Sequence, residues 1–177
     1  SWAQDAIVKW GGARRASRRF VAGETVEDAV SAVTVLNGKG ILASLDHLGE
    51  NTKDRIDAEN STNEILALIQ TIEETGIRSN ISIKLSQIGL SLDEGLCREN
   101  LRTILESARK ANNFIRIDME DSTLTQKTVN AFLWAREQGF ENVGLVIQAY
   151  LFRSMDDVLT LAKSGSSIRL CKGAYKE

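Results

Sequence analysis

The 177-residue sequence contains no proline, one histidine and two cysteines, and each scarcity excludes something. Without proline there are no cis-prolyl turns. The two cysteines, Cys97 and Cys171, lie far apart and lack the spacing of metal ligands. A reduced, intracellular protein therefore fits better than a disulfide framework. With His47 as the one histidine and no cluster of carboxylates, a transition-metal site is not expected.

Strong charge of one sign and long apolar runs are also absent. The formal net charge is −2, so nothing attracts the chain as a whole to nucleic acid or to an anionic membrane. No apolar run approaches the roughly 20 residues of a membrane span, and the first ten residues lack the layout of a signal peptide. Four arginines at 13–20 lack interleaved aromatic residues, and we interpret them as a solvated arm. We expect a cytoplasmic protein that does not bind nucleic acid.

Hydrophobic residues make up 42% of the chain, and their pattern indicates regular elements. The segment 25–40 spaces Val26, Val30 and Val33 on one helical face. Thr25 is a suitable N-cap, with Asp28 in the position that completes a capping box. The apolar run 41–46 then reads as a buried strand without strict alternation.

The same unit then repeats along the chain. We predict helices at 61–76, 94–112, 123–139 and 154–165, and strands at 81–86, 114–118, 143–148 and 167–171. Strands that alternate with helices imply right-handed βαβ units and a parallel sheet.

Two architectures remain, a doubly wound open sheet and a (β/α)₈ TIM-type barrel. The turn after the first strand has no G-x-G-x-x-G, which disfavours a dinucleotide-binding open sheet. We therefore predict a (β/α)₈ barrel, here incomplete with about five strands. Residues 1–38 are expected to form an N-terminal helical arm, and residues 39–177 the partial barrel.

Polar residues recur near the ends of all five predicted strands. A lone polar residue there is usually a helix cap or a turn former, but five in register favour an active site, because barrels build theirs at this edge. Lys84 lies between two apolar residues, so an inward-pointing ammonium would need a partner, which Asp118 on the next strand could supply. The set is Asp46, Lys84, Asp118, Gln148 and Arg169, with Lys172 following.

Cations and an amide in a barrel mouth suit a small carboxylate substrate or an anionic cofactor. In the terminal KGAY, Gly173 would let the backbone approach a ligand closely and Tyr175 would offer an aromatic wall. Two alternatives stay open. One is an aldolase that forms a Schiff base on Lys84 or Lys172, and the other is a non-catalytic, truncated barrel module.

Six segments in order resemble the monofunctional bacterial proline dehydrogenases: RRFVAGETVEDAV, LDHLGENT, ISIKLSQIGL, FIRIDMEDS, VGLVIQAYL and IRLCKGAYKE. The resemblance extends over about residues 18–177. It implies a distorted (β/α)₈ barrel with non-covalent FAD that oxidises L-proline to Δ1-pyrroline-5-carboxylate. It also implies a quinone as electron acceptor, and hence a peripheral contact with the inner face of the membrane.

The resemblance also implies residue roles. Lys84 and Tyr175 match residues that bind the substrate, and Glu50 matches an acid that forms a gating ion pair. Asp118 matches the active-site aspartate, and Arg169 matches the arginine beside the flavin N5. The positions that match FAD contacts are Met119, Gln148, Arg169, Lys172, Gly173 and Ala174.

The departure from the family lies at the end of the sequence. A complete barrel needs eight strands and about 250 residues, whereas five strands are predicted here. The family's last helix, which carries a tyrosine and paired arginines, has no counterpart in the 177 residues. We interpret the chain as a fragment. An open edge after the fifth strand predicts low stability, an oligomer formed through that edge, or weak FAD binding.

Overall fold

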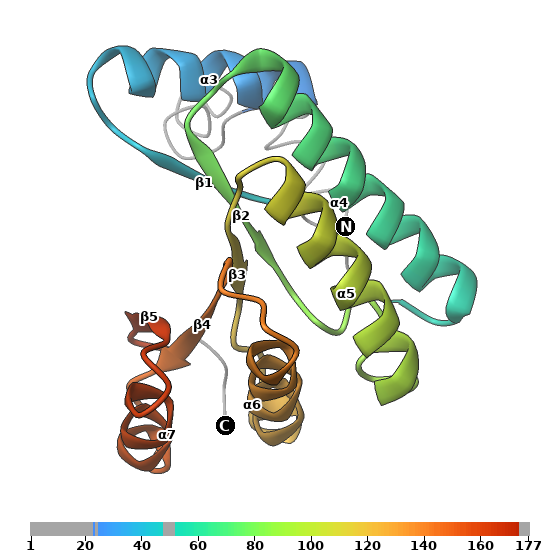
Figure 1. The fold of residues 1–177 in the computed structure, drawn as a ribbon, viewed down its shortest axis with the longest axis vertical. Helices are drawn as coiled ribbons and strands as arrows, with labels where there is room; N and C mark the ends of the chain where they lie inside the picture. The colour runs from blue at the N-terminus through green and yellow to red at the C-terminus, as the bar shows by residue number, and fades with distance from the viewer. Residues whose placement is uncertain (1–22, 24, 48–51, 174–177) are drawn as a thin grey trace, which may run out of the picture.

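A computed structural model describes residue 23 and residues 25–47 and 52–173. Its helices and strands alternate along the chain (Figure 1). They are α3 (Val26–Gly38), β1 (Ala43–Asp46), α4 (Arg55–Thr75), β2 (Ser79–Ile83), α5 (Glu94–Lys110), β3 (Ile115–Ile117), α6 (Ser122–Glu137), β4 (Val143–Gln148), α7 (Ser154–Ala162) and β5 (Ser167–Cys171).

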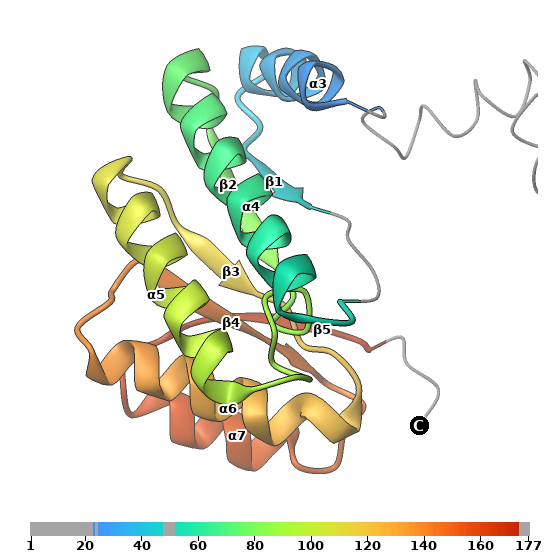
Figure 2. The ribbon, with the colours of Figure 1, turned by 90° about the vertical axis from the view of Figure 1, so that its right-hand side faces the viewer.

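The five strands form one parallel sheet in the order β1-β2-β3-β4-β5. Each strand pairs with the next in sequence, which is the order of a barrel and not of a doubly wound sheet. The sheet curls, and α4 to α7 follow its convex side (Figure 2). The predicted incomplete (β/α) barrel is therefore confirmed.

The convex face of the sheet supplies the core. Ile81, Ile83, Ile115 and Ile117 are fully buried there, and Phe132 of α6 is buried in the same apolar cluster. Each such side chain contributes about 1.5–3 kcal/mol relative to an exposed position. The outer side of the last strand is less covered, since Leu170 of β5 is 65% exposed.

The N-terminal boundary of α3 agrees with the sequence, but that of α4 does not. The hydroxyl of Thr25 accepts a hydrogen bond from the backbone N–H of Asp28, as predicted. The predicted start of the next helix at 61 was wrong, because α4 begins at Arg55. The carboxylate of Asp54 caps it there, and Thr62 lies inside the helix with its hydroxyl bonded to a backbone carbonyl.

The predicted strand 81–86 is also displaced. The observed β2 ends at Ile83, so Lys84 is the first residue of the following turn. That turn is buried, because Leu85, Ile88 and Leu90 are at most 1% exposed. Because β2 ends before Lys84, this residue lies at the mouth of the barrel and not inside a strand. The proposed division between arm and barrel at residue 38 stays a prediction.

Candidate functional site at the carboxyl ends of the strands

Strand register brings polar residues to one face of the sheet. Asp46 pairs with Ser82, Ser82 with Arg116, Arg116 with Gly144, and Gly144 with Ser167. Paired positions of neighbouring strands point to the same face. Because the apolar residues between them enter the core, this row lies on the concave face. In β1 this arrangement alternates polar Ser44 and Asp46 with apolar Ala43 and Leu45, which the prediction of a strand without strict alternation at 41–46 missed.

Lys84 forms an ion pair across the ends of the first two strands. Its Nζ lies 3.2 Å from Oδ2 of Asp46, and both side chains are about one-third exposed or less. The sequence offered Asp118 as a partner for this ammonium. The observed ion pair is with Asp46, and the charge of Lys84 also acts on Asp118, where it opposes the rise in pKa. The backbone N–H of Lys84 donates to Oε1 of Gln87, whose amide in turn donates to the carbonyl of His47. Gln87 thus connects Lys84 to the residue that follows Asp46.

Asp118 follows β3 and is half-buried. Burial raises the pKa of this carboxyl, and the negative charge of Asp46 raises it further. The positive charges of Lys84, Arg169 and Arg116 oppose both effects. Among the described residues, three cations thus act on Asp118 against the one carboxylate of Asp46, and this excess of positive charge favours an anionic ligand.

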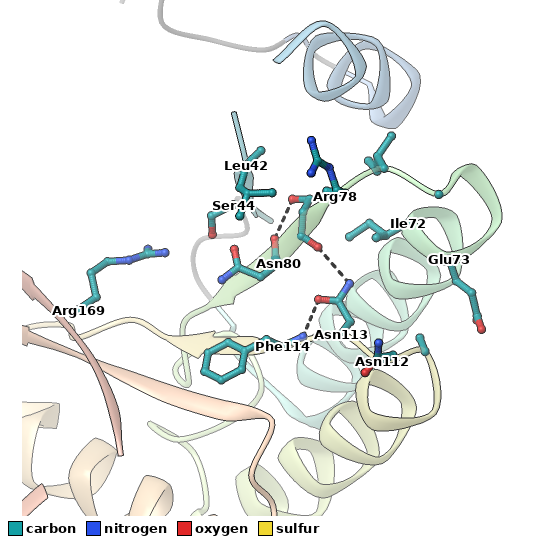
Figure 3. Close-up of a pocket in the computed structure, with 15 residues that line it drawn as sticks. Leu42, Ser44, Ile72, Glu73, Arg78, Asn80, Asn112, Asn113, Phe114 and Arg169 are labelled. Carbon is teal, nitrogen blue, oxygen red and sulfur yellow. Dashed lines mark hydrogen bonds between the residues drawn. The ribbon is translucent and has the colours of Figure 1, made fainter. Parts of the chain in front are cut away.

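Arg169 crosses the concave face from β5 to β2. Its Nη1 donates to Oγ of Ser82, at 3.3 Å. Figure 3 shows its side chain pointing away from β5 toward Ser44 and Asn80. Arg169 also lines a pocket of about 740 Å³ at the amino ends of β1 to β3. The side chain of Arg169 thus extends toward the amino ends of the neighbouring strands, although β5 itself ends at the same edge as the carboxyl ends of the other strands.

Arg116 is a residue of this face that the sequence interpretation missed. Its two terminal nitrogens donate to the carbonyl and hydroxyl oxygens of Ser167, at 2.9 and 3.1 Å. Burial lowers its pKa, as does the nearby charge of Arg169, while Asp118 acts in the opposite direction. The available signal was its position two residues before Asp118, which puts both on one face of a strand.

Gln148 and Met119, both predicted to contact FAD, lie together. Nε2 of Gln148 donates to the carbonyl of Met119 at 2.9 Å, and both residues are about 5% exposed or less. Oε1 of Gln148 is buried and has no hydrogen-bond partner among the described residues. A buried acceptor without a donor suits the N–H of a flavin pyrimidine ring, so this pair fits the group that the resemblance implies.

The turn after β5 closely approaches the turn after β4. Gly173 has a φ of +107°, and an added Cβ would lie 2.0 Å from Cδ1 of Tyr150. The backbone N–H of Tyr150 donates to the carbonyl of Lys172, whose own side chain is exposed. The close approach that Gly173 allows within the described chain is therefore to Tyr150.

Several further points concern the predicted site. Glu50, Ala174 and Tyr175 lie outside the described residues. Nε2 of His47, which follows β1, lies 3.1 Å from Oε2 of Glu64 on α4. Glu120, which was not predicted, accepts hydrogen bonds from the backbone and hydroxyl of Ser86 and so joins two turns at this edge. The described part of the chain contains no group of three or more metal-ligating side chains.

Fold and site together define an incomplete (β/α)-barrel protein with charged side chains gathered near the carboxyl ends of its strands. The sequence pattern of the family described as Proline dehydrogenase matches residues 29–177, and the chain belongs to this family.

Relatives agree with this membership. Over 166 residues the chain is 40% identical to proline dehydrogenase 1 of Bacillus subtilis, and the match covers 94% of this chain and 55% of the relative. The chain is also 39% identical to proline dehydrogenase of Deinococcus radiodurans, and that match covers 91% of this chain and 53% of the relative. The chain thus spans about half the length of the curated relatives that it matches.

Solved structures share the fold. Proline utilization A from Bdellovibrio bacteriovorus, inactivated by N-propargylglycine, superposes with a TM-score of 0.78 at 23% identity, over 88% of this chain and 20% of that protein. A bifunctional proline utilization A protein gives a TM-score of 0.64 at 27% identity, over 86% and 18%. In the described residues, no helix combines the length and apolar character needed to cross a membrane.

Proposed function

We propose that this chain contributes to the oxidation of L-proline to Δ1-pyrroline-5-carboxylate by bound FAD. The observation that carries the proposal is that the charges of Lys84 and Arg169 act on Asp118, with Gln148 bonded to the next residue, Met119, in a partial barrel of the proline dehydrogenase family. Relatives that are 36–40% identical bear this activity in their names.

The product defines what the residues must do. Its C=N bond joins the ring nitrogen to the carbon that does not carry the carboxylate, so that carbon loses a hydride and the nitrogen loses a proton. FAD, when bound, supplies the acceptor for the hydride and its electron pair. The protein has to hold the carboxylate and orient the ring.

Lys84 is the proposed anchor for the substrate carboxylate. Its ammonium lies at the barrel mouth and is already directed by Asp46. A charge-assisted hydrogen bond between ammonium and carboxylate is short and about twice as strong as a neutral one. Asp118 is proposed to accept a hydrogen bond from the ring nitrogen, because it is the half-buried carboxylate next to this cation.

Gln148 and Arg169 are the proposed contacts for the flavin. The free Oε1 of Gln148 would accept from the pyrimidine ring, while Met119, Lys172, Gly173 and Ala174 would line the same group. The charge of Arg169 would stabilise the negative charge that the flavin gains on reduction. We further propose that a quinone accepts the electrons, and that the protein is cytoplasmic and contacts the inner face of the membrane peripherally.

An anaerobic titration tests this function. Purified protein is incubated with FAD, separated from free flavin, and mixed with L-proline, with D-proline as control. Loss of the oxidised flavin absorbance with L-proline alone is the expected result. Absence of bleaching although flavin is bound would refute proline as the reductant.

Borohydride trapping of a carbonyl substrate tests the aldolase alternative. The ion pair of Lys84 disfavours a Schiff base on that residue, because a charged ammonium is a poor nucleophile.

A further inference from the structure

Two arginines cross the concave face in opposite directions. Arg116 extends from β3 over β4 to Ser167 at the start of β5. Arg169 extends from β5 back to Ser82 on β2. Both hydroxyl partners belong to the row of paired positions that contains Arg116 itself. The two side chains therefore connect strands that are not neighbours in the sheet.

The path of Arg116 depends on a missing side chain. Gly144 lies between Arg116 and Ser167 in the register. A Cβ at Gly144 would lie 2.3 Å from Nη1 of Arg116 and 2.7 Å from the carbonyl oxygen of Ser167. Real Cβ atoms do not make such contacts, so only glycine lets the guanidinium pass over β4.

The anchored end of β5 is an edge position. Within the described residues β5 pairs with β4 alone, so little else holds Ser167 in place. Arg169 is two residues further on the same strand and faces the same side. Arg169 itself pairs with Val146 of β4, so a fixed Ser167 would add to this pairing in setting the direction in which the guanidinium leaves the strand.

Arg116 has features of a fixed group. It is 9% exposed, its Cζ lies 4.8 Å from the centroid of the Phe114 ring, and its fork makes two hydrogen bonds to one residue. A planar, two-pronged guanidinium holds such a geometry better than an ammonium can. Its charge is close to that of Arg169, so it repels the group that it positions.

We propose that Arg116 is a positioning residue for Arg169. By binding Ser167 across Gly144, it fixes the start of β5 and so directs Arg169 over the concave face. The inference rests on the proposed function only where it concerns flavin. Removing Arg116 should then change the reduction potential of bound flavin because Arg169 is displaced, and not because a second positive charge is lost.

The first measurement needs no flavin. Hydrogen–deuterium exchange of the peptide containing β5 is compared in the wild type, in Arg116→Met, and in the matched control Arg109→Met, whose arginine lies on α5 over the ring of Phe140. We expect β5 to exchange about tenfold faster in Arg116→Met alone, in line with the loss of a charged hydrogen-bond donor. Unchanged exchange in β5 would overturn the proposal, whether or not the protein binds FAD.

The second measurement is a double-mutant cycle on the reduction potential of bound flavin. Arg116→Met and Arg169→Met should each lower the potential, and the double variant should lower it no further than Arg169→Met alone. Arg116→Lys, which keeps the charge but loses the fork, should resemble Arg116→Met. Additive effects, or rescue by lysine, would show that Arg116 acts by charge and contradict positioning. If the wild type binds no flavin, the proposed function fails, but the exchange result still decides whether Arg116 holds the start of β5.

Gly144→Ala and Ser167→Ala complete the test. Both keep the charge of Arg116, but the first blocks its path and the second removes one of its two acceptors. We expect faster β5 exchange in both, with the smaller change in Ser167→Ala. Should Gly144→Ala fail to fold, Ser167→Ala still distinguishes position from charge.

Discussion

Nζ of Lys84 lies 3.2 Å from Oδ2 of Asp46, and this ion pair joins the turn that follows β2 to the end of β1. Both groups are partly exposed, so the pair contributes at most about 1 kcal/mol to stability. Its importance is that it directs an ammonium to the mouth of the barrel. The carboxylate of a substrate would compete with Asp46 for the same cation.

This competition gives opposite expectations for the two partners. Lys84→Met should weaken proline binding about tenfold or more, because a charge-assisted hydrogen bond is lost. Asp46→Asn should not weaken it, and should strengthen it if Asp46 competes. Proline dissociation constants from titration of flavin-loaded protein provide the measurement. A loss of affinity in Asp46→Asn equal to that in Lys84→Met would argue that the intact pair, and not the free cation, binds substrate.

Asp118 is expected to reduce the stability of the fold at neutral pH. Its pKa is raised, so the folded state binds the proton more tightly than the unfolded state. The destabilisation is absent below the unfolded pKa of about 3.9 and grows as pH rises through the folded pKa. Asp118→Asn should therefore gain stability over the wild type as pH rises through this window, while losing proline binding.

Urea unfolding at a series of pH values checks this expectation, with the low-pH difference as the internal reference. Neutral replacement removes the buried charge but keeps the size of the side chain. If the difference between Asp118→Asn and wild type stayed constant across the series, the inferred rise in pKa would be wrong. If both binding and stability fell together at neutral pH, Asp118 would be acting mainly as a structural residue.

The two cysteines should react very differently. Cys97 is fully buried, and burial raises the pKa of its thiol to about 12, whereas Cys171 at the end of β5 is exposed. Since the thiolate is the reactive form, a thiol reagent at neutral pH should modify one cysteine in the native protein and both after unfolding. Cys171→Ser should abolish the fast reaction.

The same reaction reports where flavin binds. Cys171 pairs in register with Gln148, which we propose to contact the flavin. Added FAD should therefore slow the labelling of Cys171, and Gln148→Leu should remove this protection. Equal labelling rates with and without bound FAD would place the cofactor elsewhere.

The sequence allowed the order of elements to be predicted because glycines and caps mark the ends of the helices. It was less informative about positions, as the start of α4 shows. Ser61 and Thr62 resemble caps as well as Asp54 does, and only the packing of Ala58 against the core distinguishes them. Similarly, buried turn residues such as Leu85 have the apolar character of a strand.

The candidate site was predictable in part for a related reason. Polar residues at strand ends can be recognised one strand at a time, which is how Asp118 and Gln148 were found. The role of Arg116 depends on which residues face it on the next two strands, and that requires the register with Gly144 and Ser167. Spacing along the chain does not contain this information, because loop lengths between the strands vary.

Gly173 provides a test of the turn that the resemblance assigns to FAD. Alanine there would suffer both an unfavourable φ of +107° and a clash with the ring of Tyr150. Gly139→Ala is the matched control, since it has a φ of +81° with open space around its Cβ position. We expect Gly173→Ala to cost about 1–3 kcal/mol of unfolding free energy and to exceed the control. Adding Tyr150→Ala should recover part of the flavin affinity that Gly173→Ala loses. Equal costs for the two glycines would mean that the ring moves aside, and that strain in φ alone sets the penalty.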